Sequence, residues 1–451
     1  MSPAAGTARE TALETASETA LPLAASELHV ILKGRARQVL IARPNVRQYG
    51  HLALEIFMAI EEAQRIGADV AFLRPRRVVG EALFQLEPAG VRVLQPNAVA
   101  SLPYRLRWFV AHAGPEVERV ADHAVTELKR ASRYELRPHI DNVSLPETFR
   151  QQLRNFNARW LDLPKRVISD VPEPRYFSRR AFNRRIPVSL PPALDQLARQ
   201  QAAEYGIPAD ARIVTLHVRE AGYKRGQEME DVKPGVREDA VRNAHIEHYF
   251  AAIEHLVGLG YTVVRLGDAS MTPLAMPGVV DLALSPTRTN LLDVYCLLHS
   301  VFMIGCESGP SSLTYLTNTP CLWVNGTDPV TSYPIRADAM YLLKRVRDRR
   351  TRRFLTLEDR LQHDYIEHFR HTQRNEYFDN TPDEILAAAK EMEALVHERT
   401  PLTAQQSAFR ERVTAAGVHF ADRLAYVRKW GPDEGFLGDG RMAQVALDQD
   451  S

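Results

Sequence analysis

The polar residues that close two apolar, β-branched runs carry side chains suited to holding a phosphate group or a sugar. The first run, residues 213–218, contains His217 and is followed by Arg219. Alternate residues of a strand point to the same side, so these two side chains share one face at the strand end. An arginine fork there suits a diphosphate, because hydrogen bonds to charged groups are worth about 1.5–3 kcal/mol. The alternative interpretation is a buried ion pair between Arg219 and a neighbouring acid.

The second run, residues 302–306, leads into the sequence Glu-Ser-Gly-Pro-Ser-Ser. A glycine lets a ligand approach the backbone, and a proline suits the first turn of a helix. Free N–H groups and hydroxyls at such a helix start can bind phosphate oxygens or a sugar. Helix capping by serine is the alternative interpretation. We predict ligand contacts for Glu307, Ser308, Gly309, Ser311 and Ser312.

Further candidate ligand-binding residues follow a third apolar run and precede a helical pattern. Residues 261–266 contain Arg265 and are followed by Gly267 and Asp268. We expect Gly267 and Asp268 to hold a base or a ribose, unless they only form a turn. Asn243 precedes a helical pattern, so its alternative role is that of an N-cap. Arg265 and Asn243 complete the predicted ligand-binding set.

Strand and helix patterns alternate through this part of the chain. Apolar residues at three- and four-residue spacing predict helices, and β-branched apolar runs predict strands. The strands are expected at 213–218, 261–266, 279–284, 301–305 and 321–324, and the helices at 245–259, 290–299 and 310–317. This alternation predicts βαβ units and a parallel sheet covered on both faces. Ligands of such sheets bind beyond the carboxyl ends of the strands, where the polar residues named above fall.

A second alternation of strands and a helix lies nearer the N-terminus. It predicts strands at 39–42, 70–73 and 91–94 and a helix from residue 49 to about residue 66. Gly50 and His51 open that helix, where a close backbone approach and the helix dipole can hold an anion or a substrate hydroxyl. Alternatively, Gly50 only makes the turn and His51 packs. The fold class predicted from both alternations is α/β, with two Rossmann-like domains.

At 451 residues the chain is too long for one compact core. We divide it into a disordered leader (1–26), an N-terminal Rossmann-like domain (27–190), a second Rossmann-like domain (191–345) and a C-terminal helical extension with a tail (346–451). A polar loop from Glu220 to residue 239 is expected to cover the site. Residues 344–353 include seven basic residues in ten. That run indicates a solvated face or loop, and contact with a phosphorylated or lipid-linked acceptor is the alternative.

The bulk properties of the sequence exclude several classes of protein. A net charge of +1 gives no general attraction to nucleic acid or to an anionic membrane. The three cysteines form no Cys-x-x-Cys pair and are expected to be reduced core residues. The first 26 residues lack a signal peptide pattern, and the apolar region 291–305 is too short to span a bilayer. We therefore expect a cytoplasmic protein with no nucleic-acid partner and no integral membrane segment, and leave its oligomeric state open.

Several motifs of nucleotide chemistry do not occur in the sequence. Neither Gly-x-x-x-x-Gly-Lys-Ser/Thr nor a Gly-x-Gly-x-x-Gly after a strand is present, which disfavours phosphate-loop hydrolysis and nicotinamide chemistry. The one Asp-x-Asp, residues 448–450, lies in the tail, so we expect no metal site. A leaving diphosphate would then be stabilised by Arg219 and by helix N-termini.

The motifs resemble those of a bacterial family of glycosyltransferases. The resemblance covers roughly residues 38–397 and rests on YGHLALE (49–55), HVREAGY (217–223), GYTVVRLGD (260–268), PGVVD (277–281), IGCESG (304–309) and NTPDEI (380–385). More distantly, His-x-Arg is similar to the motif of fucosyltransferases with a two-Rossmann, GT-B-type fold, in which the arginine binds the nucleotide diphosphate. The Ser-Gly turn is similar to one in heptosyltransferases of that fold class.

The resemblance implies an inverting, metal-independent transfer of a sugar from a nucleotide sugar to an acceptor hydroxyl or amine, in a cleft between two domains. The donor would be a GDP- or ADP-sugar with no other cofactor, and the pathway would make a surface polysaccharide or a natural product. Glu220 stands where the fucosyltransferase pattern has a second basic residue. The N-terminal domain would face the acceptor, and our candidates for the general base are His51 and Glu220. The alternatives are a nucleotide-sugar epimerase and a non-catalytic sugar-nucleotide-binding protein.

Overall fold

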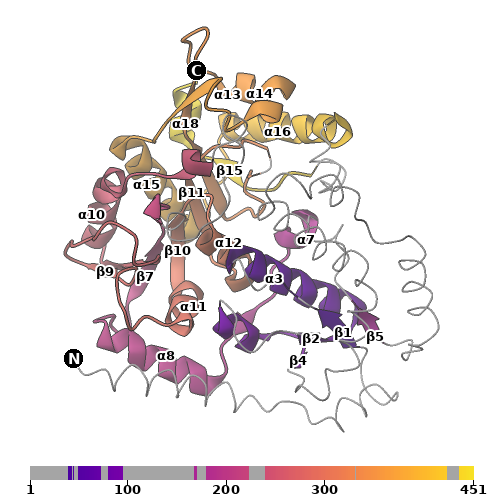
Figure 1. Cartoon of the computed structure of the whole chain (residues 1–451), viewed down its shortest axis with the longest axis vertical. Helices are drawn as coiled ribbons and strands as arrows, with labels where there is room; N and C mark the ends of the chain where they lie inside the picture. The colour runs from indigo at the N-terminus through magenta and orange to yellow at the C-terminus, as the bar shows by residue number, and fades with distance from the viewer. Residues whose placement is uncertain are drawn as a thin grey trace, which may run out of the picture.

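The computed structural model describes residues 39–42, 44, 49–72, 80–94, 167–169, 179–222, 239–330, 332–423 and 436–450. The predicted leader and most of the predicted cover loop, residues 223–238, lie outside these ranges. The described residues form a mixed α/β structure with two parallel sheets (Figure 1).

The first sheet has four parallel strands in the order β4-β2-β1-β5. Its elements are β1 (Val39–Ala42), α3 (Tyr49–Ile66), β2 (Asp69–Phe72), β4 (Val93–Leu94) and β5 (Val167–Ser169). Gly67, at φ +67°, takes the left-handed conformation that ends α3 without strain. The predicted strand–helix–strand unit in residues 39–72 is therefore present, and it places the start of α3 at the carboxyl end of β1.

The second sheet has seven strands in the order β15-β12-β11-β10-β7-β8-β9, and all of its paired strands are parallel. They are β7 (Arg212–Leu216), β8 (Tyr261–Arg265), β9 (Val279–Asp281), β10 (Ser300–Gly305), β11 (Cys321–Gly326), β12 (Ala339–Leu343) and β15 (Arg441–Met442). The order of connection reverses between β7 and β10. Such a reversal opens a crevice at the carboxyl ends of the two strands, where ligands of open α/β sheets bind.

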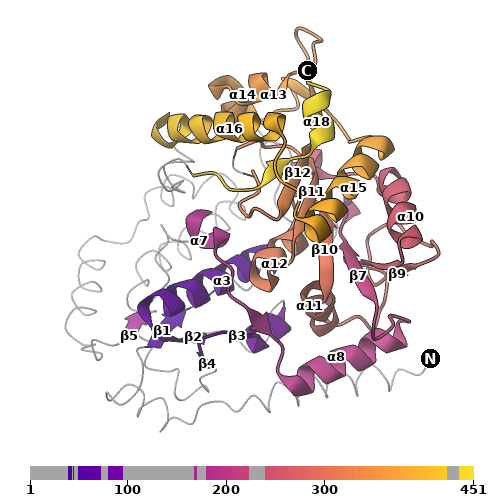
Figure 2. The same ribbon diagram turned by 180° about the vertical axis from the view of Figure 1, so that it is seen from behind.

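Helices cover both faces of the second sheet (Figures 1 and 2). The helices α8 (Pro192–Glu204), α11 (Asn290–Leu298) and α12 (Gly309–Thr317) pack on one face, and α10 (Phe250–Gly258) and α15 (Pro382–Glu398) on the other. The predicted helix 245–259 begins as a separate 3-10 turn, η5 (Ile246–Tyr249). The start of α15 is a capping box, in which Thr381 and Glu384 each accept from the other's backbone N–H at 3.3 and 2.7 Å.

One buried apolar cluster contains residues of both sheets. Helix α3 packs against α12 (Figure 1). Its Phe57 stacks on Phe182 with ring centroids 5.2 Å apart. Arg336 is only 3% exposed, and its guanidinium donates to the carbonyls of Phe182 and Thr314, at 3.1 Å in each case. Because these groups join the two halves of the chain, the relative position of the helix starts is fixed by packing.

The C-terminal residues complete the second sheet. β13 (Arg345–Asp348) and β14 (Asn375–Phe378) form an antiparallel pair, and β15 adds the last strand beside β12. The predicted extension, residues 346–451, is thus continuous with the second sheet; two-residue β15 is too short to predict from a sequence pattern. The remaining elements are η2 (Glu81–Gln85), β3 (Glu87–Pro88), α7 (Arg179–Asn183), β6 (Val188–Ser189), η4 (Asp239–Arg242), α13 (Leu357–Arg360), α14 (His363–His368), α16 (Ala404–Arg423) and α18 (Gln444–Asp448).

Candidate functional site

The reversal between β7 and β10, called the switch point below, brings the two predicted motifs together. Leu216 lies opposite Ile304 in the parallel pair, and the backbone N–H of His217 donates to the Ile304 carbonyl at 2.9 Å. The backbone N–H of Arg219 donates to Cys306 Sγ at 3.2 Å. Two motifs separated by almost ninety residues in the sequence therefore share one sheet edge.

His217 links three strand ends. It is 3% exposed, its Nδ1 lies 3.0 Å from the Leu266 carbonyl, and its Nε2 lies 2.9 Å from Ser308 Oγ. Burial lowers the pKa of His217 to about 4, so the ring is neutral near pH 7. A neutral ring that donates from Nδ1 to the carbonyl must accept at Nε2, so the Ser308 hydroxyl donates to it. His217 therefore acts as a structural link, and it fixes the direction of the Ser308 hydroxyl.

The start of α12 has no side-chain cap. Ser308 occupies the N-cap position, but its side chain makes no capping hydrogen bond, because the hydroxyl is bonded to His217. Ser311 is fully buried, and its Oγ accepts from the Cys306 backbone N–H at 3.2 Å. We predicted a ligand contact for Ser311, but the structure places it within the turn. The half-buried Ser312 lies in the same first turn.

The start of α3 meets the start of α12. A Cβ atom added to Gly50 would lie 2.7 Å from Gly309 Cα and 3.3 Å from Ser312 Oγ. Only a glycine allows this approach, so two helix N-termini direct their partial positive charge at one region. His51 follows on α3 with an exposed side chain, and partial desolvation by the surrounding protein lowers its pKa.

The predicted base Glu220 has both carboxylate oxygens engaged. Oε1 accepts from Arg265 Nη2 at 2.5 Å, and Oε2 accepts from the Thr272 backbone N–H and hydroxyl at 2.8 and 2.7 Å. Arg265 is 0% exposed and also pairs with Asp281 at 3.1 Å. This network stabilises the ends of β7, β8 and β9. Arg265 thus lies in the protein interior, not at the ligand-facing position that we predicted for it.

Glu307 is likewise held by the protein. It is 6% exposed and accepts from Thr327 Oγ1 at 2.7 Å, Tyr341 Oη at 2.9 Å and Arg370 Nη2 at 2.5 Å. Burial alone would raise its pKa, but the Arg370 charge and these hydrogen bonds lower the pKa to about 2. The carboxylate is therefore ionised, and its lone pairs are used within the fold. The sugar contact that we predicted for Glu307 has no open acceptor position.

Gly267 and Asp268 lie at the rim of the switch point. Asp268 Oδ1 accepts from the Ser270 backbone N–H at 2.9 Å, and Arg288 Nη1 donates to the Gly267 carbonyl. Arg288 also pairs with Asp293 at 3.1 Å, and burial raises the pKa of Asp293 to about 6. The predicted turn is present, and the contact of these residues with a base or ribose stays a prediction.

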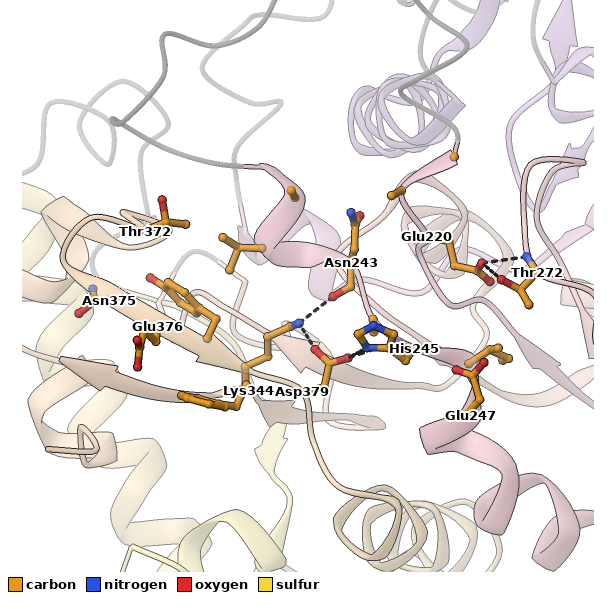
Figure 3. A pocket seen from close by; sticks show the side chains of 18 of the residues that line it. Glu220, Asn243, His245, Glu247, Thr272, Lys344, Thr372, Asn375, Glu376 and Asp379 are labelled. Atoms are coloured by element: carbon orange, nitrogen blue, oxygen red, sulfur yellow. Dashed lines mark hydrogen bonds and ion pairs between the residues drawn. The ribbon is translucent and has the colours of Figure 1, made fainter. Parts of the chain in front are cut away.

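A cavity of about 780 Å³, called the pocket below, adjoins the switch point (Figure 3). The segment 220–222, the segment 240–247 and the β13–β14 pair form its walls. Asn243 lines it, and its backbone carbonyl accepts from Lys344 Nζ at 2.7 Å. The ligand contact that we predicted for Asn243 stays a prediction.

The sequence analysis missed the charged cluster in this pocket. His245 Nδ1 lies 2.8 Å from Asp379 Oδ2, and Lys344 Nζ donates to Asp379 Oδ1 at 2.5 Å. Burial favours the neutral form of Asp379, but the Lys344 charge and the hydrogen bonds prevail and hold its pKa below the usual range. The three residues come from distant parts of the chain, so no local sequence pattern predicts that they form a cluster.

The described residues show neither a metal-binding cluster nor a membrane-spanning helix. Over the described ranges, no group of three or more His, Cys, Asp or Glu residues is arranged to hold a metal ion. The same residues include no helix with the length and apolarity needed to cross a membrane. Independence of a metal stays a prediction.

Comparisons with known proteins find only remote structural similarity. No family model and no curated protein matches the chain. E. coli ADP-heptose LPS heptosyltransferase II is 13% identical over 80% of this chain and 99% of that chain, with a TM-score of 0.38. A family 9 glycosyl transferase from Veillonella parvula is 11% identical over 68% of this chain and 86% of that chain, with a TM-score of 0.36.

A third solved structure is the fucosyltransferase NodZ from Bradyrhizobium. It is 16% identical over 63% of this chain and 94% of that chain, with a TM-score of 0.30. All three proteins are named as glycosyltransferases. Overlaps as remote as these assign neither a donor nor an activity to this chain.

Proposed function

We propose that the protein is a glycosyltransferase that moves a sugar from a nucleotide-diphosphate sugar to an acceptor hydroxyl or amine. The observation that carries this proposal is the contact between the starts of α3 and α12 at Gly50 and Gly309. Arg219 stands at the same edge, since its backbone bonds to Cys306, three residues before Gly309. Two helix N-termini and a guanidinium group together suit a diphosphate.

The uncapped start of α12 favours the same ligand. His217 draws the Ser308 hydroxyl away from the helix, so the first N–H groups of α12 keep no side-chain cap. Such N–H groups bind anions well. In our proposal the diphosphate lies against Gly309 and Ser312. Gly50 lets the start of α3 lie close to the start of α12, so both helix starts are near the diphosphate.

The chemistry proposed for this site is an inverting, metal-independent displacement. The acceptor oxygen or nitrogen attacks the anomeric carbon, and the bond to the diphosphate oxygen breaks. Arg219 and the helix N-termini stabilise the charge that develops on the leaving diphosphate. A GDP- or ADP-sugar is the donor that we expect, and the acceptor belongs to surface polysaccharide or natural-product synthesis.

The attack also needs a general base near the acceptor. Of the two predicted candidates, Glu220 has both oxygens bonded within the fold, whereas His51 has a lowered pKa and lies on α3 beside Gly50. His51 is therefore the stronger of these two.

The test of the proposal is calorimetric binding of GDP, ADP, UDP, dTDP and CDP, with and without Mg²⁺, to wild type and Arg219→Ala. We expect one Mg²⁺-independent binder whose affinity falls roughly tenfold to 150-fold in the variant, because the lost charged hydrogen bonds are worth about 1.5–3 kcal/mol. Release of that diphosphate from its sugar conjugate only when an acceptor is added would separate a transferase from an epimerase. Failure of every nucleotide to bind would refute the proposal.

A further inference from the structure

A histidine–carboxylate pair forms part of the pocket wall (Figure 3). His245 Nδ1 lies 2.8 Å from Asp379 Oδ2, and the same oxygen accepts from the His245 backbone N–H at 3.1 Å. Because a carboxylate only accepts, Nδ1 carries the proton and Nε2 has its lone pair available. Among the described residues none bonds to that Nε2, and the side chain is 76% exposed. The ring therefore has the orientation and access of a general base.

The segment that carries His245 is bonded to the switch point. The Ala244 backbone N–H donates to the Arg219 carbonyl at 3.0 Å, and Arg242 Nη1 donates to the Glu307 carbonyl at 3.0 Å. His245 thus follows directly on a residue bonded to the main chain that presents Arg219. The pocket and the switch point are neighbours through these bonds, and Glu220 forms part of the pocket wall.

The lining of the pocket suits a polyhydroxylated ligand. It combines hydroxyl, amide and aromatic side chains with charged ones of both signs, and a volume of about 780 Å³ lies within the usual range for small-molecule sites. Asn243 Oδ1 is buried, and over the described part of the chain it has no hydrogen-bond partner. The groups that contribute are Asn243, Ser270, Thr272, Asn375, Tyr377 and Phe378.

We infer that this pocket binds a saccharide acceptor and that His245, oriented by Asp379, is the general base of the transfer. The inference rests on the proposed glycosyltransferase function. His245 Nε2 takes the proton of the acceptor hydroxyl while the acceptor oxygen bonds to the anomeric carbon of the donor. The bond from that carbon to the diphosphate oxygen breaks, and its electron pair leaves with the diphosphate beside Arg219. Asp379 stabilises the imidazolium, which then releases its proton to solvent.

This assignment differs from both bases predicted from the sequence. Glu220 is bonded through both oxygens to Arg265 and Thr272. His51 belongs to α3 and does not line the pocket. His245 alone among the three combines a carboxylate partner with a place in the pocket.

The first test measures transfer to added methyl glycosides from the sugar conjugate of whichever nucleotide calorimetry identifies. His245→Gln is expected to lower the rate roughly 10²–10⁴-fold, the usual contribution of a general base. Its affinity for the nucleoside diphosphate should stay within about twofold of wild type, since no phosphate contact is lost. His248→Gln is the matched control: its ring lies 5.7 Å from that of His245, and its Nδ1 bonds to the Asn380 carbonyl at 3.0 Å. We expect the wild-type rate for it.

The second test needs no turnover. Ring ¹⁵N spectra should show His245 protonated at Nδ1 in wild type. In Asp379→Asn the preference for this tautomer should be lost. If Asp379 only stabilised the fold, the substitution would leave the tautomer of His245 unchanged. Methyl glycosides added with the nucleoside diphosphate should shift the His245 ring signals. The inference would be overturned by a wild-type rate in His245→Gln, or by His245 ring signals that no glycoside shifts. Neither result would affect Arg219-dependent nucleotide binding. Absence of that nucleotide binding would instead overturn the proposed function, and the inference with it.

Discussion

The switch point and the pocket contain the same kinds of ionisable side chain, but they use them differently. At the switch point His217 has hydrogen bonds at both ring nitrogens, and Glu307 is almost fully buried and held by Arg370. In the pocket His245 uses one ring nitrogen and is mostly exposed. Groups of the first kind build the edge of the sheet, whereas a group of the second kind can exchange a proton with a ligand. His217 and Glu307 therefore have structural roles, whereas the nearby His245 is available for proton transfer.

The largest effect is expected from Glu307→Gln. The change leaves Arg370, only 8% exposed, without its carboxylate, and breaking a buried pair typically costs about 3–5 kcal/mol. The free energy of unfolding, measured with guanidinium chloride, should fall by that amount. Glu247→Gln, at an exposed position in the pocket wall, is the control and should change it by less than about 0.5 kcal/mol. Equal stabilities of the two variants would contradict the structural role of Glu307.

A pH dependence follows from His217. Its pKa falls from 6.5 to about 4 on folding, so between these values the unfolded chain binds a proton that the folded chain does not. Stability should therefore decrease as pH falls through this window, by about 3 kcal/mol in total. His217→Asn should flatten that slope in urea unfolding measured from pH 7 to pH 4. Asp293, with a pKa of about 6, titrates in both proteins, so its contribution cancels in the difference. An unchanged slope would mean that His217 is not held neutral.

The smallest effect concerns the cap of α12. Ser308→Asp places a negative charge at a helix start that we propose for the diphosphate, so the nucleoside diphosphate should bind roughly tenfold more weakly. Ser308→Asn is the matched uncharged variant and should weaken binding by less. Calorimetry of both variants measures the difference. If the aspartate and asparagine variants bind equally well, the phosphates do not lie at α12.

The sequence predicted the position of the switch point better than the roles of the residues around it. Apolar runs and their polar ends located β7, β8 and β10, and the rule for parallel sheets correctly placed His217, Arg219 and Glu307 at one edge. Sequence patterns do not show how far a charged group is satisfied inside the protein. Arg265 and Glu307 therefore looked like ligand contacts, although their partners Asp281 and Arg370 make them internal.

The pocket could not be predicted from sequence patterns, because it is formed by residues that are distant in the sequence. His245 and Asp379 are separated by 134 positions, and their contact depends on how β14 and η5 pack. His245 appeared only as the start of a helix, and Lys344 only as the first of a basic run. The contact between Gly50 and Gly309 also joins distant segments, so only the structure could reveal that the two helix starts meet.

The most direct test of the account is a crystal structure with the nucleoside diphosphate that binds most tightly. We predict its β-phosphate within hydrogen-bonding distance of the α12 backbone N–H groups at Gly309 and Ser312 and of the Arg219 guanidinium. The pocket beside His245 should remain open to an acceptor. A diphosphate bound instead in the pocket, against Lys344, would contradict the assignment of the donor to the switch point.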